Sequence, residues 1–299
     1  MTAVDRYLVV GNPIAHSRSP EIHAAFARQT GEPIGYERLL VPTDPPQAFA
    51  RAMDAFFEGG GRGANVTLPF KEQAFAYAAG HSDRAALAEA VNTLVVRAAG
   101  VHGDNTDGPG LVADLQGRLR VELAGRSVLL LGAGGAARGV VMSLLQAGIA
   151  ELVVANRTPA RAEMLAARFN QSAAVREAGL PRIRALAQDA AGPADLIINA
   201  TSSGVLNAPL LLQQGLFRDC LMAYDFVYGP RPTGFMEQAA QGGAARTSDG
   251  LGMLVEQAAE SFLIWRGVRP ATEPVFRSLR AAVAAQALGA QAAGAADVS

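Results

Sequence analysis

Cysteine, lysine and tryptophan are the residues that this sequence of 299 amino acids uses least, with one copy of each, Cys220, Lys71 and Trp265. A single cysteine excludes an internal disulfide and favours a reducing compartment. An excess of charge of one sign is also missing, because 26 basic and 27 acidic residues leave a net charge of −1. Nucleic acids and anionic membranes attract proteins that carry a basic excess. We therefore expect a cytoplasmic protein that binds neither of them.

Long hydrophobic runs are missing as well. The N-terminal stretch carries Asp5 and only a short apolar run, which is not typical of a signal peptide. The most apolar later stretch, residues 128–155, is interrupted by glycines, Arg138 and Glu151, which argues against a membrane span. Half of the residues are apolar and 18% are charged, which excludes disorder for most of the chain. At roughly 150 residues per domain, the length predicts two domains.

Short apolar runs alternate with helical patterns in the first third of the chain, which is typical of an α/β sheet. Ser19, Pro20 and Glu21 form a helix start signal, with Ser19 expected as the N-cap. The expected strands cover residues 6–12, 36–41, 64–68 and 92–96, and the expected helices cover residues 19–29, 48–57 and 71–79.

The middle of the chain has continuous apolar runs of about five residues, which predict parallel strands covered on both faces. The last stretch, residues 289–299, is rich in alanine and glycine and is expected to fray. The expected strands cover residues 127–131, 151–155, 195–199 and 221–226, and the expected helices cover residues 110–119, 159–169, 253–265, 273–288 and a stretch that ends near residue 147.

These patterns predict an α/β protein of two domains. The sheet of the second domain is complete before residue 250, so we expect the C-terminal helices to return to the first domain and make it discontinuous. We predict a discontinuous N-terminal α/β domain for substrate binding and catalysis, residues 1–106 and 247–299. Residues 107–246 are predicted to form a doubly wound, Rossmann-type dinucleotide-binding domain.

A glycine-rich turn follows the apolar strand at residues 127–131, in the strand–turn–helix order that dinucleotide binding requires. Gly132 permits the sharp turn, and Gly134 lets a pyrophosphate approach the backbone at the positive end of the next helix. A packing turn without a ligand is the alternative interpretation. The residues expected to hold the pyrophosphate are Gly132, Ala133, Gly134, Gly135 and Ala136.

The second strand of this domain leads into Asn156, where NAD sites usually carry an acid that accepts from the ribose 2′-hydroxyl. No acid follows until Glu163, whereas Arg157 and Arg161 supply two guanidinium groups that suit a 2′-phosphate. We therefore expect NADP rather than NAD. Alternatively, both arginines are ordinary solvated helix residues.

Lys71 is the one position where a chain with 25 arginines keeps a lysine. Arginine is effectively always charged, whereas lysine can give up a proton, as an acid in catalysis must. The alternative is that this lysine was kept by chance on a helix surface and has no catalytic role. Polar residues also gather at expected strand ends, where ligands of α/β sheets bind, and they suit a small carboxylate with several hydroxyls. These polar clusters are residues 16–19, 65–71, 91–93 and 105–108.

Nine segments, in order along nearly the whole chain, resemble the shikimate dehydrogenase family. The resemblance implies NADPH-dependent, reversible reduction of 3-dehydroshikimate to shikimate, a step of chorismate and aromatic amino acid biosynthesis. One departure is Thr233-Gly234-Phe235, where the family often has Thr-Pro-Leu. The nine segments are residues 17–20, 65–71, 92–93, 105–108, 132–137, 156–161, 199–202, 224–228 and 249–257.

The resemblance also implies roles for individual residues. Lys71 and Asp107 match the catalytic pair, and Ser17 and Ser19 match residues that bind the substrate carboxylate. The other implied substrate-binding residues are Thr67, Asn92, Tyr228 and Gln257. The implied cofactor-binding residues beyond the glycine turn are Asn156, Arg157, Thr158 and Arg161 at the 2′-phosphate, and Thr201, Phe226, Gly250 and Met253 elsewhere, with Gly250 near the nicotinamide.

Structural alternatives and other functions stay open. Asp107 and Ser19 could serve only as helix caps. A quinate/shikimate dehydrogenase of broader substrate range could use NAD or NADP, and a non-catalytic ligand-sensing module could use the same scaffold. The four histidines show no metal-ligand spacing, so no metal is expected. The expected partner is the small-molecule substrate, and the protein is expected to be a monomer or a homodimer.

Overall fold

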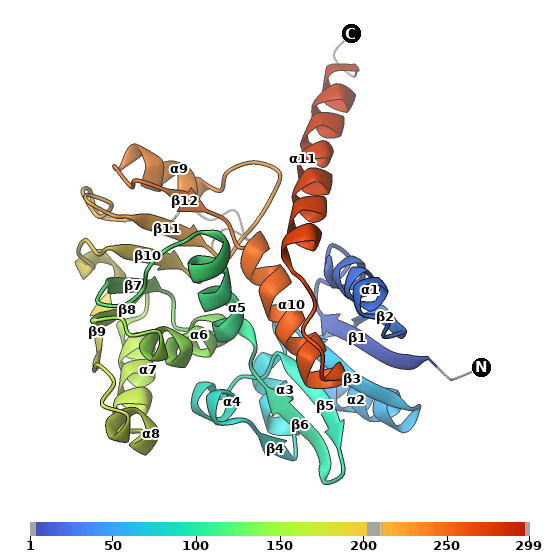
Figure 1. Ribbon diagram of the computed structural model, residues 1–299. Helices are drawn as coiled ribbons and strands as arrows, with labels where there is room; N and C mark the ends of the chain where they lie inside the picture. The colour runs from blue at the N-terminus through green and yellow to red at the C-terminus, as the bar shows by residue number, and fades with distance from the viewer. Residues whose placement is uncertain (1–3, 202–209, 211, 297–299) are drawn as a thin grey trace. The chain divides into compact units, whose positions relative to one another are not determined.

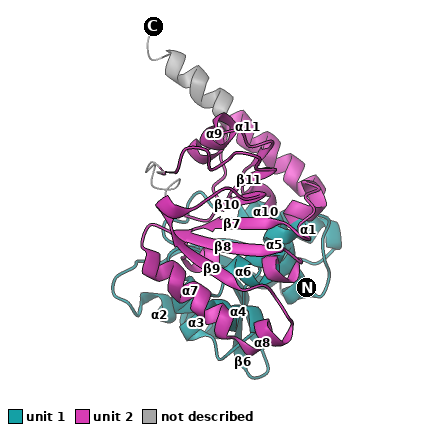
Figure 2. Cartoon of the chain, turned by 90° about the vertical axis from the view of Figure 1, so that its left-hand side faces the viewer, with its two compact units in different colours: residues 1–113, 138–143, 255–272 teal, residues 114–137, 144–254, 273–299 magenta. Residues whose placement is uncertain are grey.

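The computed structural model of the chain describes residues 4–201, 210 and 212–296, with side chains described up to residue 286. These residues form two compact units, each built around a six-stranded sheet (Figures 1 and 2). The first unit comprises residues 1–113, 138–143 and 255–272, and the second comprises residues 114–137, 144–254 and 273–299. Within the described part of the chain, no helix is both long and apolar enough to cross a membrane.

The sheet of the first unit is mixed, with the strand order β2-β1-β3-β5-β6-β4. Strand β1 pairs in parallel with β2 and β3, whereas β5 runs antiparallel to β3 and β6. The strands are β1 (Asp5–Gly11), β2 (Ile34–Leu40), β3 (Gly61–Val66), β4 (Gly80–His81), β5 (Thr93–Arg97) and β6 (Gly100–Asp104). The helices are α1 (Ser19–Thr30), α2 (Ala48–Glu58), α3 (Lys71–Tyr77), α4 (Asp83–Ala88) and α5 (Asp107–Ala113).

Apolar residues at helical spacing anchor the first unit around its sheet. Phe49, Met53 and Phe56 lie on one face of α2 and are buried in the core. Phe49 stacks on Phe70, with ring centroids 5.3 Å apart, and Phe70 is only 1% exposed. Burying a side chain of this size contributes roughly 1.5–3 kcal/mol. Because Phe70 directly precedes Lys71, this packing fixes the start of α3.

The sheet of the second unit is parallel throughout, with the order β12-β11-β10-β7-β8-β9. This is the order of doubly wound dinucleotide-binding sheets. The strands are β7 (Ser127–Leu131), β8 (Glu151–Asn156), β9 (Ile183–Ala187), β10 (Leu196–Asn199), β11 (Met222–Asp225) and β12 (Thr247–Ser248). The helices are α6 (Gly135–Gln146), α7 (Pro159–Gln171), α8 (Ala173–Glu177), α9 (Gly234–Gln241), α10 (Leu251–Arg266) and α11 (Glu273–Ala296), with a 3-10 turn at Gln188–Ala190. Residues 138–143 of α6 and residues 255–266 of α10 group with the first unit.

Several local predictions are wrong. Ser19 is the first residue of α1 rather than its N-cap, and Arg18 occupies the cap position without a side-chain cap. The helix predicted at residues 110–119 begins at Asp107 and continues as a π-helix over Asp114–Arg118. The tail belongs to helix α11 as far as Ala296, and its fraying stays a prediction.

Other elements were not predicted at all. Strand β6 follows β5 in a hairpin, but its residues, Gly100–Asp104, are too polar and glycine-rich to resemble a strand. Also not predicted from the sequence were the strands β4, β9 and β12 and the helices α4, α8 and α9. Helix α11 groups with the second unit, whereas the sequence assigned it to the substrate domain. The functional domain boundaries stay a prediction.

Candidate active site

Lys71 and Asp107 form a buried ion pair in the first unit. Each is the first residue of its helix, α3 and α5 respectively. Lys71 Nζ lies 2.5 Å from Asp107 Oδ2, and the two side chains are only 12% and 7% exposed. Opposite charges attract each other far more strongly in such surroundings than in water. Asp107 therefore holds the ammonium group of Lys71 in one position.

The Asn92 carboxamide holds Asp107 from its other oxygen. Asn92 Nδ2 donates to Asp107 Oδ1 at 2.8 Å and to Thr106 Oγ1 at 2.9 Å. Asn92 Oδ1 accepts from the backbone N–H of Thr106 at 2.8 Å. Gln257 Oε1 lies 3.4 Å from Asn92 Nδ2. The structure thus brings four predicted site residues, Lys71, Asp107, Asn92 and Gln257, into one network.

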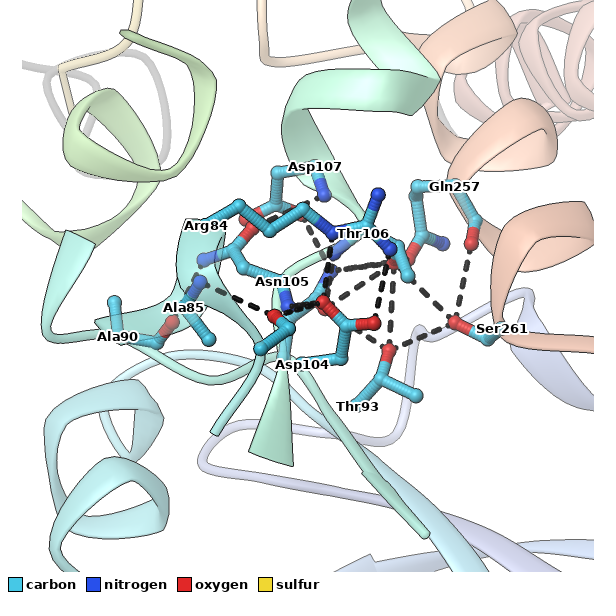
Figure 3. A network of polar contacts seen from close by, with 12 residues as sticks. Arg84, Ala85, Ala90, Thr93, Asp104, Asn105, Thr106, Asp107, Gln257 and Ser261 are labelled. Atoms are coloured by element: carbon cyan, nitrogen blue, oxygen red, sulfur yellow. Dashed lines mark hydrogen bonds and ion pairs between the residues drawn. The ribbon is translucent and has the colours of Figure 1, made fainter. Parts of the chain in front are cut away.

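Polar side chains fix the loop that leads into Asp107 (Figure 3). Asp104 binds the Arg84 guanidinium through two contacts of 2.7 and 2.9 Å, and it accepts from the backbone N–H of Asn105 at 2.7 Å. Asn105 Oδ1 in turn accepts from the backbone N–H of Asp107 at 3.1 Å. The carboxylate of Asp107 is therefore set in place by its own loop before any ligand binds.

Ser17 and Ser19 lie beside each other at the start of α1. Ser17 Oγ donates to Ser19 Oγ at 3.2 Å and accepts from the backbone N–H of Ser19 at 3.3 Å. Arg38 Nε donates to the Ser17 carbonyl at 2.9 Å. Thr67, which follows β3, is half-buried. Since β1 and β3 are parallel neighbours, the segments that carry these hydroxyls leave the sheet at the same edge.

Four further polar residues of this network were not predicted as site residues: Asn65, Thr93, Thr106 and Ser261. Asn65 Nδ2 donates to Ser261 Oγ at 2.9 Å and to Thr93 Oγ1 at 3.2 Å. Thr93 Oγ1 donates to Asn92 Oδ1 at 2.9 Å. All four are at most 6% exposed. Three of them lie in the polar clusters of the sequence, but Ser261 carries no such signal because it is 196 positions from Asn65.

The glycine turn of the second unit has room for a phosphate. Gly132 has φ +109°, which side-chain-bearing residues rarely adopt, and a Cβ there would lie 3.1 Å from the Ala200 backbone. A Cβ on Gly134, in contrast, would meet no atom within 4 Å. Helix α6 begins at Gly135, so its first backbone N–H groups have no partner within the helix. Open space beside free N–H groups fits a pyrophosphate.

Two unpaired arginines lie after β8. Arg157 and Arg161 are exposed, and within the described residues neither side chain makes an ion pair or a hydrogen bond. Asn156 Nδ2 donates to the Thr158 carbonyl at 2.9 Å, which closes the turn between β8 and α7. Two free guanidinium groups beside a neutral turn fit a dianionic phosphate.

The remaining predicted cofactor residues follow β10 and β11 or lie at the start of α10. Thr201 Oγ1 donates to the side chain at the end of β10 at 2.7 Å. A Cβ on Gly250 would lie 2.2 Å from the Phe226 carbonyl oxygen, so these two backbones approach closely. The Met253 N–H donates to a tyrosine hydroxyl of β11 at 3.3 Å. Tyr228 is partly buried in the same unit, and its approach to a substrate stays a prediction.

The two units together hold the parts that a dehydrogenase needs. An ammonium group held among hydroxyls and amides can bind a polyhydroxylated ligand and donate a proton to it. A glycine turn with two free arginines can bind a dinucleotide that carries an additional phosphate.

Comparison with known proteins identifies the family. Three family models match the chain in order: the shikimate dehydrogenase substrate binding domain at residues 9–94, shikimate / quinate 5-dehydrogenase at 114–214, and the shikimate 5'-dehydrogenase C-terminal domain at 250–280. The shikimate dehydrogenase (NADP(+)) of Bordetella petrii is 52% identical over 282 residues, which cover 94% of this chain and 97% of that one. The chain belongs to the shikimate dehydrogenase family.

Solved structures agree with this family. Shikimate 5-dehydrogenase from Thermus thermophilus, in complex with NADP(H) and shikimate, has a TM-score of 0.80 at 35% identity and covers 93% of this chain and 100% of its own. An Ael1 enzyme from Pseudomonas putida has a TM-score of 0.82 at 40% identity, with coverages of 92% and 98%. The predicted family and the α/β fold with a Rossmann-type sheet are confirmed.

Proposed function

We propose that this chain catalyses the NADP-dependent, reversible reduction of 3-dehydroshikimate to shikimate. The observation that carries the proposal is the ion pair of Lys71 and Asp107, whose Nζ and Oδ2 atoms lie 2.5 Å apart. Amides and hydroxyls surround this pair and shield it from solvent. A shikimate dehydrogenase (NADP(+)) that is 52% identical supports both the substrate and the cofactor. A ligand-sensing module would need no proton donor at this position, so the pair favours an enzyme.

Lys71 is the group that moves the proton. When bound, NADPH supplies a hydride to the carbonyl carbon. Negative charge then develops on the carbonyl oxygen, and that oxygen takes a proton from Lys71 Nζ as the C=O bond becomes C–OH. In the reverse direction the neutral amine accepts the hydroxyl proton. General acid catalysis of this kind contributes roughly 10²–10⁴-fold in rate. Asp107 orients the ammonium group through its Oδ2.

Substrate binding is assigned to the polar side chains of the network and its surroundings. Asn92 and Gln257 are buried, at 3% and 9% exposure, and they present amide groups suited to ring hydroxyls. The paired hydroxyls of Ser17 and Ser19 suit a carboxylate. Buried polar groups of this kind reject analogues that leave them unpaired. Thr67 and Tyr228 complete the proposed set.

Cofactor binding is assigned to the second unit. The turn formed by Gly132, Ala133, Gly134, Gly135 and Ala136 would hold the pyrophosphate, supported by the open space at Gly134. Arg157 and Arg161, with Asn156 and Thr158, would hold the 2′-phosphate. Thr201, Phe226, Gly250 and Met253 would line the path toward the nicotinamide.

Location and assembly complete the proposed function. We assign the protein to the cytoplasm, as a monomer or a homodimer, with its substrate as the expected partner. The single cysteine, Cys220, cannot form an internal disulfide, which supports a reducing compartment. Size-exclusion chromatography with light scattering would decide between monomer and dimer.

Nicotinamide absorbance gives the direct test. We expect reduction of NADP⁺ by the purified chain with shikimate, and much slower reduction of NAD⁺ at equal concentration. Comparable rates with quinate, or with NAD⁺, would favour the broader quinate/shikimate dehydrogenase. Cofactor binding without any turnover of shikimate would contradict the proposed reaction and favour the ligand-sensing module.

A further inference from the structure

Tyr36, a residue of β2 that no part of the proposed mechanism uses, contacts the polar network. Its hydroxyl donates to Asn65 Oδ1 at 2.7 Å. Burial raises the pKa of Tyr36 well above its ordinary value, and hydrogen bonding with Ser19 opposes this rise. Tyr36 therefore keeps its proton at neutral pH and acts as a donor to Asn65.

This contact and a backbone contact together fix which way the Asn65 carboxamide faces, because Asn65 Nδ2 also donates to the Asn92 backbone carbonyl at 3.3 Å. A carboxamide has one accepting and one donating end. Because the Tyr36 hydroxyl occupies Asn65 Oδ1, the Nδ2 end faces the opposite way, toward Thr93 Oγ1 at 3.2 Å and Ser261 Oγ at 2.9 Å. A reversed amide would lose the bond that the Tyr36 hydroxyl donates and would place its oxygen against the Asn92 carbonyl oxygen.

The direction of the amide passes along the network to the ion pair. Thr93 Oγ1 accepts from Asn65 and donates to Asn92 Oδ1 at 2.9 Å, where the backbone N–H of Thr106 donates as well. With its oxygen occupied, Asn92 turns Nδ2 toward Asp107 Oδ1, at 2.8 Å. A series of hydrogen bonds thus runs from the Tyr36 hydroxyl through Asn65, Thr93 and Asn92 to the carboxylate that holds Lys71.

Aromatic packing holds Tyr36 in place. The ring of His23 stacks on Tyr36 with centroids 4.2 Å apart and planes 11° apart, and Trp265 lies 6.2 Å away. His23 is completely buried, and burial lowers the pKa of its imidazole to about 3. Because His23 is uncharged, it packs against the Tyr36 ring and needs no charged partner. Tyr36 is therefore rigid as well as directional.

We propose that Tyr36 is a positioning residue of the substrate site, whose hydroxyl, together with the backbone contacts of Asn65 and Asn92, holds these two carboxamides in their orientation. This inference rests on the proposed function, because Asn92 is assigned there to bind substrate hydroxyls. Tyr36 touches neither reacting atom nor cofactor in this role. Its loss should weaken binding of shikimate and leave binding of NADP⁺ unchanged, since the cofactor residues belong to the second unit.

Steady-state kinetics of Tyr36→Phe test the inference. This variant keeps the ring that stacks on His23 and removes only the hydroxyl. We expect a roughly tenfold higher KM for shikimate, the size expected when a buried acceptor loses its donor, with kcat and the Kd of NADP⁺ within about threefold of wild type. Tyr7→Phe is the matched control, because Tyr7 stacks on Trp265 in the same unit while its hydroxyl faces Arg266 at 3.5 Å. Its kinetics should equal those of the wild type.

A double-mutant cycle tests whether the residues act in series. Thr93→Val removes the next hydroxyl along the network, and we expect a similar rise in KM. If both changes interrupt one series, the double variant should resemble either single variant, with a rise of roughly tenfold rather than roughly a hundredfold. A rise in KM of roughly a hundredfold in the double variant would overturn the inference. A Tyr36→Phe variant that behaves like Tyr7→Phe would overturn it as well.

A spectroscopic measurement separates this inference from the proposed reaction. In protein labelled with ¹⁵N-asparagine, the side-chain NH₂ resonances of Asn65 and Asn92 should shift in Tyr36→Phe and stay in place in Tyr7→Phe. This result is independent of turnover, so an inactive wild type would overturn the proposed function alone. Unchanged Asn92 resonances in a folded Tyr36→Phe variant would overturn the role of Tyr36, whatever the activity.

Discussion

The two units of this protein prepare their ligand sites in opposite ways. In the first unit the polar groups around Lys71 and Asp107 are bonded to one another and buried, with Thr93 and Thr106 fully inaccessible. In the second unit the groups assigned to phosphate binding are left free, as the open space at Gly134 and the exposed Arg157 and Arg161 demonstrate. One site is satisfied before its ligand arrives, and the other is not.

This difference matches the kind of recognition that each ligand requires. Ring hydroxyls are recognised by hydrogen-bond geometry, and leaving a buried donor or acceptor without its partner costs roughly 1–3 kcal/mol. A phosphate is recognised mainly by charge, which acts over longer distances and tolerates exposed, mobile side chains. The hydrogen-bonding groups of the first unit must therefore be in position before the ligand binds. The second unit needs only free N–H groups and guanidinium groups.

The largest effect is expected where the satisfied site is broken at its charge pair. Asp107→Asn removes the partner of a lysine that is 12% exposed, so the ammonium group loses its fixed position. We expect kcat to fall roughly 10²-fold, with the Kd of NADPH unchanged. Asp104→Asn is the matched control in the same loop, since it breaks an ion pair with Arg84 that lies away from Lys71. Equal losses of kcat in both variants would show that loop disorder, and not the ion pair, is responsible.

A smaller effect is expected at the open site. Replacing Arg157 or Arg161 by Ala removes one charge from the proposed 2′-phosphate site, and each change should raise the KM for NADP⁺ roughly tenfold. The KM for NAD⁺ should stay the same, because NAD⁺ has no such phosphate. Arg176→Ala, an exposed arginine of α8, is the control. If the KM for NAD⁺ rises as much as the KM for NADP⁺, these arginines contribute to dinucleotide binding in general. That result would contradict recognition of the 2′-phosphate by their charge.

The third prediction concerns stability and belongs to the first unit. Burial lowers the pKa of His23 to about 3, below the value of about 6.5 in an unfolded chain. The unfolded chain therefore gains a proton that the folded chain does not, and stability falls as the pH drops from 6.5 toward 3. Between about pH 7 and pH 5 this amounts to about 2 kcal/mol. Urea unfolding of His23→Phe should lose that part of the pH dependence; an unchanged dependence would mean that another group titrates.

The contrast between the units also explains how far the sequence could be interpreted. The strands β7 and β8 were predicted almost to the residue, because fully buried parallel strands are continuous apolar runs. The glycine turn and the arginines after β8 are local signals that lie within a few positions of one another. The phosphate-binding part of the site could therefore be predicted from short motifs.

The substrate network could be predicted only in part, because its contacts join residues distant in the chain. Asn65 meets Ser261 across 196 positions, and Asn92 meets Gln257 across 165. Hydroxyls such as Ser261 on an apolar helix carry no local sign of a partner. The π-helix at residues 114–118 likewise depends on a tertiary contact, since Asp114 accepts from the Tyr224 hydroxyl at 2.8 Å.

The most direct test of the account is the value of kcat for Lys71→Arg at saturating 3-dehydroshikimate and NADPH. Arginine preserves the positive charge beside Asp107 but does not release a proton at neutral pH. The account predicts a fall in kcat of roughly 10²–10⁴-fold while the Kd of NADPH stays as in the wild type. A kcat close to that of the wild type, with or without a higher KM, would mean that Lys71 only positions the substrate and would contradict the account.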